Sequence, residues 1–222
     1  MEEVIRKVIY SHEFEEYYAS IDEQLRKKYD YALEIVRTQY VVSTKIVKNL
    51  ENTDFYELRV SVGSNECRTI LLAVDHDNFI QSKNVLLLNS FLKKSTKQYK
   101  AEIKKAENII KRYLEDWIMM KLDMNKLAGL KTFDDHLQER YGDKNSPERK
   151  DFEAKAKAWY YAELLKDERK RQNVTQKMLA EKIGKKREYI SALEKGQTDM
   201  QLSTFLKIAD ALGLRFSLVL GW

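Results

Sequence analysis

Residues 175–200, TQKMLAEKIGKKREYISALEKGQTDM, contain the most specific pattern in this sequence of 222 residues. Thr175 is placed to cap a helix that runs through TQKMLAEKI, and Gly184 permits the left-handed backbone of a tight turn. A second short helix follows and ends near Gly196. The stretch therefore predicts two helices joined by a turn, the arrangement of a helix-turn-helix.

In such a motif the second helix enters the major groove of DNA, with its N-terminal residues toward the base edges. We expect Arg187 to contact guanine and the lysines to contact phosphates. Glu188 could accept a hydrogen bond from cytosine or could be a solvent-facing charge, and both readings stay open. The candidate DNA-binding residues are Gln176, Lys185, Lys186, Arg187, Glu188, Tyr189, Ser191 and Lys195. The alternative is a plain helical hairpin with a solvated charged face.

The motif resembles the Xre/Cro-type helix-turn-helix, whose pattern is TQ-x-x-LA-x-x-x-G followed by IS-x-x-E-x-G. The matching residues are Thr175-Gln176, Leu179-Ala180, Gly184, Ile190-Ser191, Glu194 and Gly196. Downstream, LSTFLKIADALGL (202–214) fits the fourth helix of such a domain. The resemblance covers residues 158–214 and implies that this part of the chain binds operator DNA.

Composition and charge indicate two domains in a cytoplasmic protein. Residues 1–123 contain 20 basic and 20 acidic side chains, and residues 124–222 contain 20 and 15, which accounts for the net charge of +5. A basic second half favours a polyanionic partner. With Cys67 as the one cysteine, no intramolecular disulfide can form. The acidic N-terminus is unlike a secretory signal, and no stretch approaches the roughly 18 apolar residues of a membrane helix.

The first half has the element order of an α+β domain. Residues 4–10 could form a strand, and residues 13–40 have helical periodicity. FYELRVSV (55–62) alternates as a half-buried strand does, and CRTILLAV (67–74) and part of 79–91 follow it across two turns. These segments predict an antiparallel sheet, closed by an amphipathic helix from Tyr99 to Leu114. IMMKLDMNKLAGLK (118–131) then marks a junction, beyond which the pattern is helical apart from a possible strand in RFSLVLGW (215–222).

Basic residues of the first half could form one concave patch on the sheet. Arg59 and Arg68 lie on neighbouring predicted strands, and Lys93 and Lys94 precede the last helix. Such a patch suits an RNA phosphodiester, because fixed positive charge stabilises the phosphorane transition state and needs no metal. His12, His76 and His136 are scattered, so no metal-ligand spacing appears and we expect neither metal nor cofactor.

Each of these residues also has a purely structural interpretation. Arg59 could form a surface ion pair with Glu57 or Glu66, and the lysines could be a solvated helix start. Tyr99 could supply a proton, but it also falls on the apolar stripe of its helix, which favours a place in the core.

The first half resembles the RelE/HigB toxin superfamily, especially its phage-derived Gp49-like branch. The matching strings are NLENTDFYELRVSVGSNECRTILLAV and VLLLNSFLKKSTKQYKAEIKKAENIIKRYLED, and the resemblance covers residues 3–116. Members are endoribonucleases that cut mRNA on the ribosome. The resemblance implies that Arg59, Arg68, Lys93 and Lys94 bind the scissile phosphate, with Tyr99 as a further catalytic candidate. Two departures are Cys67, where an aromatic residue is common, and STKQYK after Lys94, which puts the acid or base in doubt.

The joint interpretation is a RelE-like toxin (1–117), a junction (118–131) and a HigA-like antitoxin (132–222) in one chain. It implies that the second half neutralises the first and represses its own operon as a dimer. Met124 could begin a second reading frame, so a natural fusion, an engineered one and two joined products all stay open. Apolar residues of 132–171 could dock on the toxin or complete the second domain's core: Phe133, Leu137, Phe152, Trp159 and Tyr160. The alternative function is a transcriptional repressor with a non-catalytic sensor or dimerisation module at its N-terminus.

Overall fold

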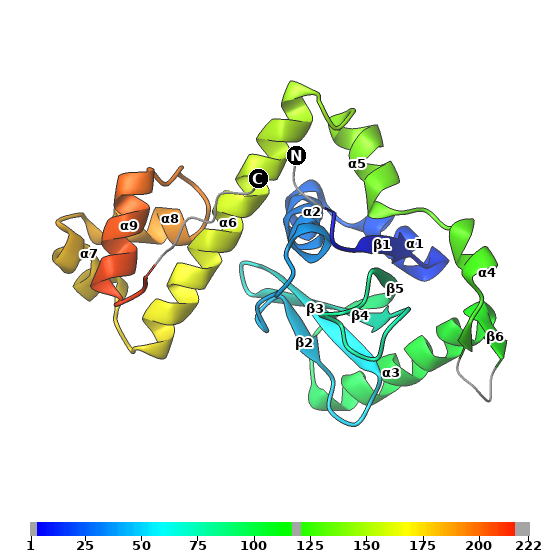
Figure 1. Cartoon of the computed structure of the whole chain (residues 1–222). Coiled ribbons are helices and arrows are strands. Elements are labelled where there is room, and N and C mark those ends of the chain that lie inside the picture. Colours follow the sequence, from blue (N-terminus) through cyan, green and yellow to red (C-terminus); the bar gives the residue numbers. More distant parts are fainter. Residues whose placement is uncertain (1–3, 117–120, 216–222) are drawn as a thin grey trace. The chain divides into compact units, whose positions relative to one another are not determined.

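The computed structural model describes residues 4–116 and 121–215, which fold into two compact units (Figure 1). The first unit is Met1–Ala156 and the second is Lys157–Trp222. The first is α+β and the second is helical, as the sequence predicts. Among the helices of the described part, none is long and apolar enough to cross a membrane.

A five-stranded sheet forms the centre of the first unit, in the order β1-β5-β4-β3-β2. The strands are β1 (Lys7–Tyr10), β2 (Val47–Asn49), β3 (Phe55–Val62), β4 (Asn65–Ala73) and β5 (Asn84–Leu92). β3, β4 and β5 pair antiparallel, which confirms the three antiparallel strands that the sequence predicts, and β2, which was not predicted, pairs antiparallel with β3. β1 instead pairs parallel with β5, so the sheet is mixed and not purely antiparallel as expected. The direction of a strand follows from its connections, which residue alternation does not encode.

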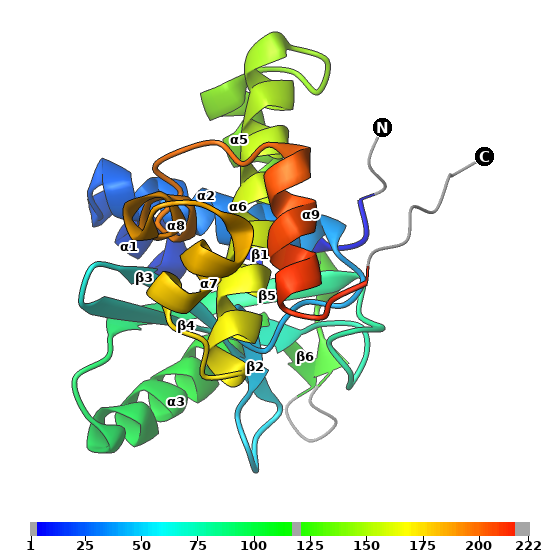
Figure 2. The same cartoon turned by 90° about the vertical axis from the view of Figure 1, so that its left-hand side faces the viewer.

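Helices cover both faces of this sheet. α1 (His12–Ser20) and α2 (Glu23–Thr38) lie on one face and α3 (Thr96–Ile110) on the other, as both views show (Figures 1 and 2). The helical pattern of 13–40 divides into two helices because Asp22 caps the second one, its carboxylate accepting from the Leu25 N–H. Apolar side chains of β4, β5 and α3, among them Ile70, Leu88 and Ala106, form a common core.

The first unit continues well past α3. η1 (Lys111–Tyr113), β6 (Leu114–Asp116), β7 (Lys121–Leu122), α4 (Met124–Ala128), α5 (Phe133–Tyr141) and the start of α6 (Pro147–Arg171) follow. Leu127 of α4 packs into the core under α3, and α5 begins with a capping box of Thr132 and Asp135. The compact unit therefore ends at Ala156, later than the junction expected at 118–131.

The second unit contains the rest of α6 with α7 (Gln176–Ile183), α8 (Arg187–Glu194) and α9 (Leu202–Ala211). Thr175 caps α7 by accepting from the Met178 N–H, and Gly184 has φ +67 in the turn before α8. Their shared core includes Leu179, Ile190 and Ile208. These features confirm the two helices and the turn predicted for 175–200. The strand expected at 215–222 falls, except for its first residue, outside the described residues.

Candidate functional site

The predicted basic residues of the first unit meet on the α3 face of the sheet. Arg59 of β3 is the cross-strand partner of Arg68 of β4. The Lys93 N–H, just past β5, donates to the Glu66 carbonyl over 2.8 Å. We call Arg59, Arg68, Lys93 and the carboxylates of Glu57 and Glu66 the basic cluster. Its three cations and two anions leave a net charge of +1.

Glu57 is the buried centre of the basic cluster and is only 2% exposed. One carboxylate oxygen accepts from Arg59 Nε at 2.6 Å, and the other accepts from the Tyr99 hydroxyl at 2.8 Å. Arg68 Nε is 3.9 Å from the second oxygen, and this buried Nε has no hydrogen-bond partner among the described residues. Glu57 thus lies between the two arginines on one side of the sheet. The Nε–H of Arg68 remains as a hydrogen-bond donor that is not used by the described residues.

Glu66 closes the cluster at the surface. Its Oε2 accepts from Arg68 Nη2 at 2.9 Å and from Lys93 Nζ at 3.0 Å. The hydrogen bond from Lys93 and the charge of Arg68 hold the pKa of Glu66 below its usual value. One carboxylate oxygen therefore bridges two of the cations predicted to hold a phosphate.

Tyr99 lies in the core and also reaches the basic cluster, while its catalytic role stays a prediction. Its ring packs at the edge of the α3 core and meets Phe91 edge-on, with centroids 5.3 Å apart. Its hydroxyl donates to Glu57 within the basic cluster. Burial and this hydrogen bond raise the pKa of Tyr99 to about 12. Lys94 is exposed beside the cluster, and its N–H donates to Gln98 in the first turn of α3.

The carboxylates of Glu57 and Glu66 were missed as members of the site, having been considered only as ion-pair partners of Arg59. Residues two apart on a strand share a face, so Glu57 and Arg59 had to be neighbours. The cross-strand pair of Arg59 and Arg68 brings Glu66 to the same face. This signal was present in FYELRVSVGSNECR.

The second unit presents charged residues at the start of α8. Lys186 is the N-cap residue, and Arg187 and Glu188 form the exposed first turn. Lys185 Nζ is 5.4 Å from the centroid of the Tyr189 ring, which is half-buried against the core. Lys195 is exposed past the other end of α8, and Ser191 is half-buried. The exposed first turn of α8 is the part that a recognition helix presents to base edges, and the DNA contacts of these residues stay predictions.

Gln176 has a partner within the second unit. Its side-chain amide donates to Glu194 Oε2 over 2.8 Å. Arg169 donates two hydrogen bonds, of 2.6 and 2.9 Å, to the same carboxylate. Arg169 also donates to the Val174 carbonyl at 2.6 Å. This network ties α6, α7 and α8 together. The phosphate contact expected of Gln176 stays a prediction.

Comparison with known protein families supports both units. Residues 16–111 match the family described as phage-derived protein Gp49-like (DUF891), and residues 165–219 match the helix-turn-helix family. The chain combines a Gp49-like domain with a helix-turn-helix domain. No curated protein and no solved structure matched the chain.

The residues that link these domains pack partly on the Gp49-like domain. Phe133, Leu137 and Phe152, three of the predicted apolar anchors, are buried in the first unit. Tyr160 is buried and Trp159 half-buried in the second unit, with the helix-turn-helix. Phe133, Leu137 and Phe152 therefore pack on the first unit, whereas Trp159 and Tyr160 belong to the second domain.

No metal centre accompanies the basic cluster in the part of the chain that the structure describes. There, no group of three or more His, Cys, Asp and Glu side chains is arranged to hold a metal ion. Cys67 is buried on β4 beside Arg68. The groups gathered at this place in the Gp49-like domain are the guanidinium, ammonium and carboxylate groups of the cluster and the phenol of Tyr99 beside it.

Proposed function

We propose that the chain is a type II toxin–antitoxin system of the RelE/HigB and HigA kind. The Gp49-like domain is the toxin, a metal-independent endoribonuclease that cleaves mRNA on the ribosome. The part that follows is the antitoxin and operator-binding repressor. The observation that carries the proposal is the convergence of Arg59, Arg68 and Lys93 around two carboxylates on one face of the sheet.

The reaction is transfer of the phosphate from the 5′ oxygen to the neighbouring 2′ oxygen of RNA. A P–O2′ bond forms and the P–O5′ bond breaks, while negative charge grows on the non-bridging oxygens. Arg59, Arg68, Lys93 and Lys94 are the groups that offset this charge, and arginine forks match phosphate geometry. No oxidant, reductant or second substrate is needed.

Two protons move in this reaction, and Glu66 of the basic cluster and Tyr99 beside it are the groups proposed to carry them. Glu66 is ionised at neutral pH and is exposed, so it accepts the 2′-hydroxyl proton once a phosphate has displaced it from Arg68. Tyr99, with a pKa of about 12, keeps its proton at neutral pH and is suited to protonate the leaving 5′ oxygen. Because residues 1–123 carry equal numbers of basic and acidic side chains, the domain has no general attraction for RNA, and we propose that the ribosome positions the mRNA.

The helix-turn-helix domain is proposed to read the operator as a dimer formed through the C-terminal half. Arg187 contacts guanine, while Lys185, Lys186 and Lys195 contact phosphates and set the register. Both activities belong to the cytoplasm, where ribosomes and operator DNA are accessible.

A second candidate function has one observation in its favour. Arg59, Arg68 and Lys93 already have carboxylate partners, as expected for a structural ion-pair network. In that case the Gp49-like domain is a non-catalytic sensor or dimerisation module, and the chain is a transcriptional repressor.

Expression of residues 1–123 alone distinguishes these functions, since this fragment retains Leu122 of the core under α3. The toxin proposal predicts growth arrest that is relieved by Arg68→Ala and by co-expression of residues 124–222. Lys48→Ala, which changes an exposed lysine of β2, is the matched control and should remain toxic. A folded but harmless fragment would establish the repressor function instead.

A further inference from the structure

Helix α2 presents a stripe of buried charge to the segment that follows the Gp49-like domain. Asp30, Glu34 and Arg37 are spaced four and three residues apart and therefore share one face of the helix. All three are no more than 3% exposed. We call them the α2 stripe. Charged side chains are rarely this buried unless other groups pair with them.

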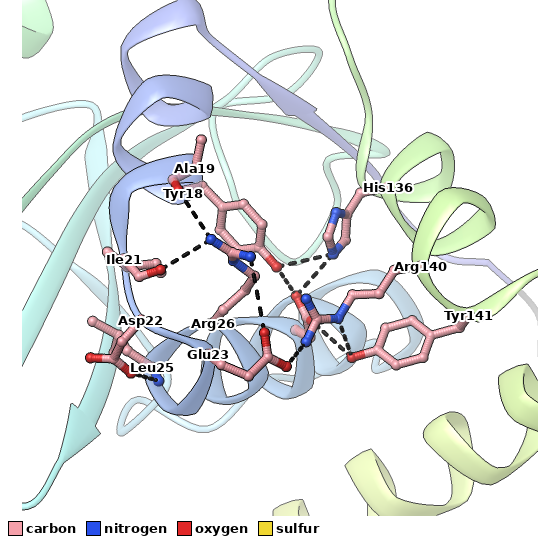
Figure 3. Close-up of polar contacts among 11 residues, drawn as sticks. Tyr18, Ala19, Ile21, Asp22, Glu23, Leu25, Arg26, His136, Arg140 and Tyr141 are labelled. Carbon is pink, nitrogen blue, oxygen red and sulfur yellow. Dashed lines mark hydrogen bonds and ion pairs between the residues drawn. The ribbon is translucent and has the colours of Figure 1, made fainter.

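Asp30 accepts from donors on both sides. His136 Nε2 is 3.1 Å from one carboxylate oxygen, and the Tyr141 hydroxyl donates to the other at 2.7 Å. Arg140 Nε is 3.2 Å from that second oxygen. Tyr18 of α1 donates to Asp30 from within the Gp49-like domain. Figure 3 shows Tyr18, His136, Arg140 and Tyr141 converging on this point, the last three from α5.

The other end of the stripe makes a second set of ion pairs. Arg37 is paired with Glu34 along α2, with nitrogen–oxygen distances of 3.0 and 3.1 Å. The same guanidinium reaches Asp134 of α5 at 3.5 Å and Glu153 of α6 at 3.4 Å. Arg149, which is 1% exposed, donates to Glu153 at 2.9 Å.

An aromatic contact joins the two ionic ends. The Phe152 ring stacks on Tyr141 with centroids 4.1 Å apart and meets Tyr31 of α2 at 5.8 Å. The entry to the segment is also fixed, because the Tyr10 N–H of β1 donates to the Lys131 carbonyl at 2.9 Å. Residues 132–156 thus follow the α2 stripe from end to end.

Residues 132–156 supply some of the partners of the α2 stripe, and the Gp49-like domain supplies the others. Without residues 132–156, Asp30 would retain its hydrogen bond from Tyr18, and Glu34 would retain its ion pair with Arg37. Water would solvate the remaining donor and acceptor groups. With the segment present, Asp30 gains His136, Arg140 and Tyr141 as partners, and Arg37 gains Asp134 and Glu153. The same surface also buries apolar side chains, because Phe133, Leu137 and Phe152 of the segment are at most 3% exposed. Mispaired charge on such a surface is costly, so the stripe also selects its partner.

We propose that residues 132–156 are the neutralising segment of this chain and that the α2 stripe is the surface by which the Gp49-like domain recognises it. That the segment neutralises a toxin rests on the proposed function. The docking of the segment on the α2 stripe does not depend on nuclease activity. The occupant is the chain's own segment, residues 132–156.

The test uses the full chain with a site-specific protease sequence inserted within residues 117–120. After cleavage, the dissociation constant of the two fragments is measured by dilution. Tyr141→Phe removes one hydroxyl and keeps the ring on Phe152. It should weaken association about 10- to 100-fold, as expected for loss of one hydrogen bond to a charged group. Tyr40→Phe, at an exposed tyrosine of the same unit, is the control and should change nothing.

Asp30→Asn is the complementary change on the Gp49-like side. It removes the charge that Arg140 and His136 share, and it should weaken association at least as much as Tyr141→Phe. If Tyr141→Phe leaves the dissociation constant equal to that of Tyr40→Phe, the proposal is overturned, because other contacts, such as the pairing of β7 with β6 and the packing of Leu127, then hold the fragments together. Separation of the unaltered fragments at micromolar concentration overturns it as well.

A growth assay separates this proposal from the proposed function. Residues 124–222 with Tyr141→Phe should protect cells from residues 1–123 less well than the unaltered antitoxin does. If association weakens as expected but residues 1–123 are harmless, the docking surface stands and the nuclease is refuted. If the fragment is toxic and Tyr141→Phe protects fully with unchanged association, the nuclease stands and the docking surface is refuted.

Discussion

Glu66→Gln should tighten phosphate binding and slow RNA cleavage. In the resting cluster, Oε2 of Glu66 bridges Arg68 and Lys93, so a substrate phosphate has to displace it. The Glu66 and Lys93 side chains are 48% and 43% exposed, which limits each ion pair to the strength of a surface pair. Two such pairs contribute about 0.4–2 kcal/mol together. Their removal should therefore improve binding about 2- to 30-fold.

The catalytic effect has the opposite sign. If Glu66 accepts the 2′-hydroxyl proton, its amide cannot replace it, and the cleavage rate should fall by about 10²- to 10⁴-fold. Binding is measured on the full chain with a 2′-deoxy dinucleotide, which cannot react. Cleavage is measured with residues 1–123 and programmed ribosomes. Glu51→Gln, at an exposed carboxylate before β3, is the control for lost charge and should leave both values unchanged.

Two results would refute this reasoning. Binding that weakens with Glu66→Gln would mean that the carboxylate supports the phosphate site and does not compete for it. Cleavage that persists at the unaltered rate would remove Glu66 from the proton path, even if binding improves. Because the side chain is exposed on the strand that follows the hairpin turn, neither result can be attributed to unfolding if the melting temperature is unchanged.

Three further predictions concern both domains. Arg187→Ala should reduce discrimination between operator and random DNA, whereas Lys195→Ala should weaken binding to both about equally, as titrations at two salt concentrations will show. Arg169→Met should destabilise the second unit by about 3 kcal/mol, because the nearly buried Glu194 carboxylate then loses its ion pair. Urea unfolding followed by circular dichroism measures this loss. Tyr99→Phe should lower stability by about 1–2 kcal/mol by removing a hydrogen bond to a buried carboxylate, and it should slow cleavage more than it weakens dinucleotide binding.

Local patterns predicted the elements that depend on neighbouring residues. The alternation of 55–62 matches β3, Thr175 caps α7, and Gly184 adopts the left-handed conformation of the turn. Each of these features is determined within a few residues, by side-chain alternation or by a capping hydrogen bond. The parallel pairing of β1 with β5 depends instead on segments more than 70 residues apart, and it was not predicted.

The sequence predicted the basic side chains of the basic cluster but not its carboxylates. The arginines and lysines were candidates because RNA requires positive charge, whereas Glu57 was assigned to a solvated strand face. In the structure α3 covers that face, so Glu57 is buried and orients Arg59 and Tyr99. Likewise, no periodicity in α2 indicated that Asp30 would meet His136, since that contact depends on where α5 docks.

The sheet separates the two surfaces proposed here. Along β3, Glu57 and Arg59 point toward α3, while Leu58 faces α2 and pairs with Thr69, which bonds the Tyr29 hydroxyl of that helix. A segment docked on the α2 stripe therefore touches none of the groups of the basic cluster. Neutralisation by residues 132–156 would act by occupying the α1–α2 face, which a ribosome-bound toxin could then not use for contact. The cluster itself would keep its affinity for a small phosphate ligand in the intact chain, because its contacts to Glu57 and Glu66 do not involve the segment.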